Sequence, residues 1–132
     1  MESYFNDLAR VVDSALVAGE RHATWFSAED SDFVRMNRGK VRQPGTVSQR
    51  FIDIRLIRGA RHASHSLSLS GDLQLDARAI GAAVAGLRDV LPQLADDPHL
   101  LLPTTVAASR TIRGAALPPT EAIVAKMLDA AA

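Results

Sequence analysis

The chain has 132 residues with 15 basic and 15 acidic side chains, and 47% of its residues are hydrophobic. This length suits one hydrophobic core, and the composition excludes an intrinsically disordered chain. The lack of cysteine excludes disulfides, thiolate nucleophiles and cysteine zinc sites. No apolar run approaches the roughly 18–20 residues of a membrane helix. The acidic start has no signal-peptide pattern, so we expect a soluble cytoplasmic protein without a membrane partner.

A helix and two short strands are expected in the first third of the chain. Residues 4–18 carry apolar side chains at three- and four-residue steps, which predicts an amphipathic helix, and Ser3 is placed to cap it. Beyond this helix the period shortens to two residues, which indicates strands at 23–27 and 32–37. The acidic run 29–32, which joins them, is interpreted as a solvated turn.

A β-meander is expected to continue from residue 37. Residues 37–40 suggest a tight turn because Gly39 tolerates a positive φ, and the Pro-Gly pair at 44–45 is typical of a type II turn. Residues 46–57 alternate, with isoleucine and leucine on one face, and form the clearest predicted strand. After a further reversal, residues 61–70 place a row of serines on one face, which we expect to be exposed.

The chain returns to helical spacing at residues 73–94. Either Asp72 or Asp76 is placed to cap this helix, and the sequence does not decide between them. Pro92 lacks a backbone donor, so it should end or kink the helix one residue earlier. Apolar positions recur at helical spacing once more after Thr120, which could cap a terminal helix.

These elements predict an α+β fold. We expect an antiparallel meander of about four strands, with the N-terminal helix and the following helix packed on one face. Residues 1–95 form one predicted domain. Residues 96–119 hold four of the six prolines and are interpreted as a connector, with at most a short strand near 104–108. Residues 120–132 are interpreted as the start of a further, truncated helix.

No catalytic or metal-binding residue is predicted in this chain. His62 and His65 lie three apart on a predicted strand, so their rings should point to opposite faces. No serine stands in a Gly-x-Ser-x-Gly elbow, and no glycine-rich phosphate loop is present. The carboxylate pairs at 29–32 and 96–97 fall in predicted solvated loops, which do not shift a pKa as acid–base catalysis requires. We expect no cofactor and no enzymatic activity from this chain alone.

The strongest signal is a basic segment from Arg35 to Arg61, with eight basic residues and one acid. Several of its guanidinium groups are expected to share one face and to contact phosphate or carboxylate. Nucleic acid, a protein or peptide, and a purely solubilising surface are the alternatives. Few aromatic side chains accompany the segment, only Phe33 and Phe51, which weighs against nucleic acid. The candidate contact residues are Arg35, Arg38, Lys40, Arg42, Arg50, Arg55 and Arg58.

The run SDFVRMNRGKVRQ at residues 31–43 resembles the early segment of the TldD/PmbA proteins. This family is known as modulators of DNA gyrase and as two-component zinc metallopeptidases. The order of predicted elements over residues 5–95 is similar as well, and the turn LIRG at 56–59 resembles the arginine-containing, glycine-closed turn of the family.

The resemblance implies a non-catalytic N-terminal domain that contributes to the assembly of homo- or heterodimeric subunits and to the access of unfolded peptide substrates. The family's zinc-binding His-Glu-x-x-x-His helix lies far beyond position 132, so zinc would belong to a missing C-terminal part of the parent protein. No catalytic or metal residue can be carried over, and the parent would be either the zinc subunit or its metal-free partner. A protein or peptide partner is favoured for the arginines. A nucleic-acid-binding module and an independent oligomerisation domain are the alternatives.

Overall fold

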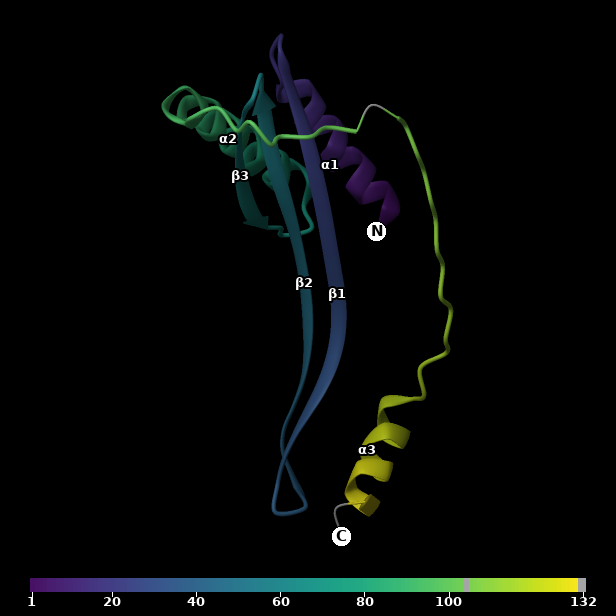
Figure 1. Ribbon diagram of the computed structural model, residues 1–132. Helices are drawn as coiled ribbons and strands as arrows, with labels where there is room; N and C mark the ends of the chain where they lie inside the picture. Colours follow the sequence, from purple (N-terminus) through teal and green to yellow (C-terminus); the bar gives the residue numbers. More distant parts are fainter. Residues whose placement is uncertain (104, 131–132) are drawn as a thin grey trace. The chain divides into compact units, whose positions relative to one another are not determined.

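The computed structural model describes residues 1–103 and 105–130 and shows an α+β fold (Figure 1). The three strands form one sheet in the order β1-β2-β3, with β3 antiparallel to β2. The predicted fold class is confirmed. The elements in chain order are α1 (Glu2–Ala15), β1 (Glu20–Asn37), β2 (Lys40–Arg58), β3 (Arg61–Ser68), α2 (Leu73–Val90), the 3₁₀ turn η1 (Leu91–Gln93) and α3 (Thr120–Ala130).

The described residues form three strands, whereas the sequence predicted about four. The segments 23–27 and 32–37 belong to one continuous strand, β1, and the acidic run 29–32 lies inside it, not in a turn. The Pro-Gly pair at 44–45 also lies within a strand, β2. Most residues of this stretch of the hairpin are exposed. Polar side chains cost little there, so hydropathy does not mark the strand.

The ends of the chain differ from the prediction in smaller ways. Helix α1 begins earlier than predicted and has Met1 at its N-cap position, so Ser3 lies inside the helix. The predicted short strand near 104–108 does not form over 105–108, and residue 104 lies outside the described residues. Pro92 does end α2, which passes into the 3₁₀ turn η1 after Val90, as the sequence predicted.

Contacts within the chain divide it into two units, each holding part of β1 and β2. The first unit comprises Met1–Glu29 and Gln49–Leu101. The second comprises Asp30–Ser48 and Leu102–Ala132, of which residues 104, 131 and 132 lie outside the described part. The hydrophobic core lies in the first unit, and no described residue of the second unit is buried.

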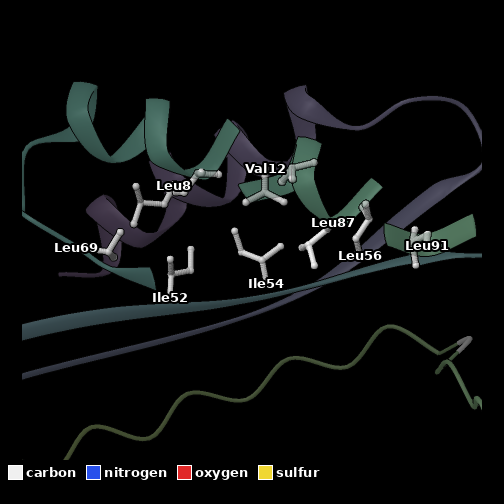
Figure 2. Packing of buried hydrophobic residues seen from close by; sticks show 10 residues of the cluster. Leu8, Val12, Ile52, Ile54, Leu56, Leu69, Leu87 and Leu91 are labelled. Atoms are coloured by element: carbon white, nitrogen blue, oxygen red, sulfur yellow. The ribbon is translucent and has the colours of Figure 1, made fainter. Parts of the chain in front are cut away.

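The core of the first unit lies between the two long helices and one face of the sheet (Figure 2). Alternate residues of β2, namely Ile52, Ile54 and Leu56, point to the helices and are completely buried. Burying one such side chain contributes about 1.5–3 kcal/mol. Helices α1 and α2 therefore cover one face of the sheet, as predicted. The other buried members of the cluster are Leu8, Val12, Leu69, Ile80, Val84, Leu87 and Leu91.

Two aspartates have different roles at the start of α2. Asp72 is the cap, because its carboxylate accepts hydrogen bonds from two N–H groups of the first turn at 2.8 and 3.0 Å. Asp76 is buried and accepts from the N–H groups of Ser70 and Gly71 at 2.9 and 3.0 Å and from the Tyr4 hydroxyl. Burial opposes ionisation of Asp76, but these hydrogen bonds outweigh it and lower its pKa. Burial and the bond to Asp76 raise the pKa of Tyr4 to about 12.

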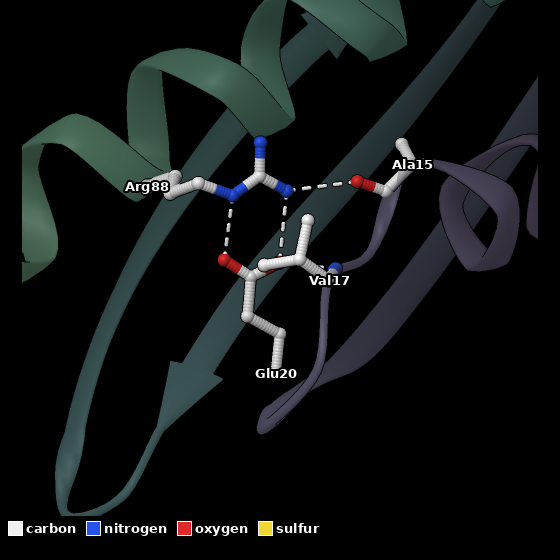
Figure 3. Close-up of polar contacts among 4 residues, drawn as sticks. All are labelled: Ala15, Val17, Glu20 and Arg88. Carbon is white, nitrogen blue, oxygen red and sulfur yellow. Dashed lines mark hydrogen bonds and ion pairs between the residues drawn. The ribbon is translucent and has the colours of Figure 1, made fainter.

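A buried ion pair lies at the start of β1 (Figure 3). The Glu20 side chain has 0% exposure, and its carboxylate accepts hydrogen bonds from Arg88 at 2.6 and 2.8 Å and from the Val17 N–H at 3.0 Å. Arg88 also donates to the Ala15 carbonyl at 2.8 Å. The bonds from Arg88 lower the pKa of Glu20, and Glu20 in turn raises that of Arg88. The pair joins α2 to the end of α1 and to the first residue of the hairpin.

The segment after η1 is tied to the turn between β2 and β3. The Arg61 guanidinium donates to Asp96 at 2.7 Å, and the Asp97 N–H donates to the Ala60 carbonyl at 2.8 Å. The His62 ring lies 3.1 Å from the Asp97 carboxylate. Asp97 has a lowered pKa because it accepts a hydrogen bond from the backbone of His99 and another from His62. Arg61 therefore has an acidic partner within its own unit.

In the second unit, α3 and the hairpin line a common cavity of about 510 Å³. Ile123, Val124 and Met127 of α3 face it together with Phe33 and Gly45. A Cβ atom at Gly45 would lie 2.6 Å from the Phe33 ring, so glycine leaves the space that the ring occupies. Ile123 and Met127 are still 39% and 40% exposed, which means that this packing is loose.

Candidate functional site

The described residues form no arrangement typical of a metal or catalytic centre. No three His, Asp or Glu side chains within residues 1–103 and 105–130 come together as metal ligands do. His62 and His65 pair with Ile57 and Ile54 of β2 and lie on opposite faces of the sheet. The buried carboxylates, Glu20 and Asp76, accept hydrogen bonds from structural partners, and these bonds lower their pKa values.

Four of the predicted contact residues gather at the end of the β1–β2 hairpin, in the second unit. All four side chains are exposed. The turn itself consists of Arg38 and Gly39, with φ values of 51° and 70°. Two positive φ values are typical of the two-residue turns that match the twist of a hairpin. The four residues, called the hairpin cations below, are Arg35, Arg38, Lys40 and Arg42.

The hairpin cations have few partners within the described chain. Arg35 contacts the Gln43 side chain at 3.4 Å and lies 5.7 Å from the centre of the Phe33 ring. Arg38, Lys40 and Arg42 make no side-chain hydrogen bond or ion pair with any described residue. Their charged groups therefore keep their donors for water or for a partner.

The other predicted contact residues are dispersed over the first unit. Arg55 is exposed on the outer face of the sheet, away from the helices. Alternation along β2 puts Arg50 and Arg58 on the opposite face, where Arg50 is half-buried and Arg58 is exposed. Arg61 is engaged with Asp96. Among the described residues, the hairpin end is therefore the one place where several basic side chains cluster without an acidic partner.

An exposed aromatic side chain that the sequence analysis did not single out lies on the outer face of the first unit. Trp25 is 71% exposed and lines a shallow hollow of about 220 Å³ with Asp53 and Arg55. Phe51, which is 37% exposed, shares this face by alternation along β2. One feature of the sequence could have predicted the exposure of Trp25: Arg21 lies four residues before it. In a strand this spacing puts both residues on one face, and the charged residue marks it as solvent-facing.

No protein-family model matches the chain, and no curated protein is similar enough to match it. The resemblance to the TldD/PmbA proteins stays a prediction, made from the run at residues 31–43 and from the order of elements. That run includes the hairpin turn and all four hairpin cations, so the resemblance and the uncompensated charge fall on the same part of the molecule.

Proposed function

We propose that this chain is the non-catalytic N-terminal domain of a cytoplasmic TldD/PmbA-type metallopeptidase. The hairpin cations would contact acidic groups of a partner subunit and of unfolded peptides that approach the catalytic chamber. Zinc would belong to another part of the parent protein. The observation that carries the proposal is the cluster of four exposed cations at one turn, three of them without any polar side-chain partner among the described residues.

The first argument for a partner is electrostatic. Elsewhere in the chain, Arg61 and Arg88 have carboxylate partners at 2.7 and 2.6 Å. At the hairpin end, four like charges lie within a few residues and repel one another. An acidic partner would relieve this repulsion and would form charge-assisted hydrogen bonds, which are the stronger kind. The hairpin end is therefore suited to anionic protein groups.

The second argument comes from the backbone of Arg38. This residue has a φ of 51°, the left-handed conformation, which costs a residue other than glycine about 1 kcal/mol. Asparagine or glycine is the usual choice at this position of such a turn. Arginine at position 38 therefore lowers stability relative to asparagine or glycine. Such a cost is expected where the side chain is needed to contact a partner.

A binding experiment tests the role of the hairpin cations. The probe is a fluorescent unstructured peptide of glycine, serine and glutamate, and its anisotropy is followed on titration with the chain. Replacing all four hairpin cations with serine should weaken binding at least about tenfold, the effect of losing about 1.4 kcal/mol. A matched control replaces Arg10, Arg78, Arg113 and Lys126 with serine, which changes the net charge equally. Equal weakening by both variants would show that only net charge matters and would overturn the proposal.

The family assignment is tested separately. The reading frame beyond codon 132 should continue and encode either His-Glu-x-x-x-His or a corresponding helix without the zinc ligands. The chain alone, incubated with an unfolded protein substrate and zinc, should cleave nothing. Peptidase activity of the purified chain, whether or not a chelator abolishes it, would contradict a non-catalytic domain.

A second candidate, nucleic-acid binding, is favoured by one observation: Trp25 is exposed on the same face as Arg55. An aromatic ring beside a guanidinium group is the combination that stacks on bases and holds phosphates. Trp25 is the single tryptophan of the chain, so its fluorescence reports this face alone. Quenching by single-stranded DNA at low salt, lost steeply as salt rises and abolished in Arg55→Ser, would support this candidate. Unchanged fluorescence at low salt would remove it.

A further inference from the structure

Strand β3 of the first unit forms an edge of the sheet. Among the described residues its only strand neighbour is β2. The sequence RHASHSLS contains no proline, lysine or acidic residue. Proteins commonly protect exposed edges with such residues, because an unprotected edge pairs with other extended chains. Strand β3 therefore has the composition of an edge that accepts a strand.

The backbone directions show which groups are available at this edge. The N–H of Leu69 donates to the Arg50 carbonyl of β2 at 2.9 Å, so it points toward the sheet. Backbone directions alternate along a strand. The N–H and carbonyl groups of Ser64, Ser66 and Ser68 consequently point to the open side, where no described backbone group bonds to them. Three consecutive donor and acceptor sites are free.

A groove runs beside this edge, between β3 and α2. Its volume is about 520 Å³, and its wall on α2 consists of small or apolar residues that include Ala79, Ala83 and Gly86. Ala63 and Leu67 of β3 form part of the opposite wall. In an added strand, alternate side chains would enter this groove and the others would lie beside the serine hydroxyls. An apolar groove next to free backbone groups is the arrangement that binds peptides by strand addition.

We propose that the edge of β3 binds an extended peptide segment that alternates apolar with uncharged polar side chains. The backbone of Ser64, Ser66 and Ser68 would hold the peptide, and the groove would take its apolar side chains. The polar positions would lie beside the serine hydroxyls and beside Asp53, which accepts a hydrogen bond from Ser66, so uncharged polar side chains fit there. A second copy fits less well, because β3 would offer the apolar groove the polar His65 between Ala63 and Leu67. This inference uses a surface apart from the hairpin cations and does not rest on the proposed function.

Peptide binding to the whole chain tests the inference. The probe is a fluorescent peptide in which valine alternates with serine and glutamine. Its matched control has the same sequence with alternate backbone amides N-methylated, which removes the donors of the ladder. The first peptide should bind, and the methylated one should bind at least about tenfold more weakly, because each lost hydrogen bond costs about 1 kcal/mol. Equal affinities, or no binding by either peptide, would overturn the proposal.

Two pairs of variants locate the site. Ser66→Pro removes a donor that points to the open side while sparing the bonds to β2, and Ser66→Ala controls for the lost hydroxyl. Ala83→Leu fills the groove, and Ala85→Leu makes the same change on α2 outside its lining. Ser66→Pro and Ala83→Leu should each weaken peptide binding at least about tenfold. The controls, Ser66→Ala and Ala85→Leu, should leave it unchanged. Unaltered peptide binding by both Ser66→Pro and Ala83→Leu would overturn the proposal. A dimer of the free chain that Ser66→Pro dissociates would overturn it as well.

Discussion

The two units of this molecule use the same kinds of residues in different ways. In the first unit, apolar side chains are buried and the internal charges have partners, as with Glu20 and Arg88. In the second, no described residue is buried, and the hairpin cations have no acidic partner in the described chain. Burial penalises an unpaired charge, whereas solvent tolerates it. The first unit is therefore the source of stability, and the second is free to carry charge for binding.

The largest effect is expected from breaking the buried ion pair. Arg88→Met leaves the Glu20 carboxylate buried without its partner and should lower the free energy of unfolding by about 3–5 kcal/mol at neutral pH. Chemical denaturation of the variant measures this loss. The double variant Glu20→Gln, Arg88→Met removes both charges and should recover most of it. A loss below about 1 kcal/mol would show that this ion pair contributes no more to stability than a surface ion pair does.

The pH dependence of the same pair gives a second measurement. The pKa of Glu20 is lowered in the folded chain, so its contribution is present above its ordinary pKa of 4.5 and is lost as pH falls through the folded value. The unfolding free energy of the native chain should therefore fall on acidification below that point. The double variant has no ionisable group at either position, so its unfolding free energy should fall less steeply on acidification.

Core truncation separates the two units directly. Ile54→Ala removes a completely buried side chain of β2 and should destabilise the protein by about 2–5 kcal/mol. Val124→Ala, on the loosely packed α3, should cost less than about 1 kcal/mol because the site is half-exposed. Thermal and denaturant unfolding of both variants provide the test. Similar losses in the two variants would contradict the difference in packing between the units.

The bond between Tyr4 and Asp76 is expected to have a smaller effect. Tyr4→Phe should lower the free energy of unfolding by about 1.5–3 kcal/mol, the contribution of a hydrogen bond to a charged group. Tyr4 is the single tyrosine, so the absorbance of tyrosinate follows it alone and should titrate near 12, above its ordinary 10. Because the folded pKa is raised, this stabilisation is complete below pH 10 and is lost as pH rises through about 12. Titration near 10 in the folded chain would contradict the bond.

The smallest expected change is a gain in stability at the hairpin turn. Arg38→Asn relieves a positive φ and should raise the free energy of unfolding by about 0.5–1 kcal/mol, while it weakens binding of the acidic peptide. Arg42→Asn, at a position with an ordinary strand conformation, is the control for lost charge. A stabilised Arg38 variant that binds normally would mean that this arginine has no role in contact.

The sequence by itself determined the elements that have strong periodicity. The alternation of Ile52, Ile54 and Leu56 identified the central strand, and the spacing of Ile80, Val84 and Leu87 identified α2. The cluster of basic residues was visible as well. These features could be predicted because a buried face imposes a period on the residues that form it.

Other features were decided only by the tertiary structure. Whether Asp72 or Asp76 caps α2 depended on Tyr4 and Ser70, which surround Asp76 from other parts of the chain. The continuity of β1 through its acidic run could not be predicted, because a strand exposed to solvent imposes no hydrophobic period. The separation of paired from unpaired arginines likewise depended on contacts with distant carboxylates. The sequence showed where the charges are, and the fold decided which of them have carboxylate partners in the described chain.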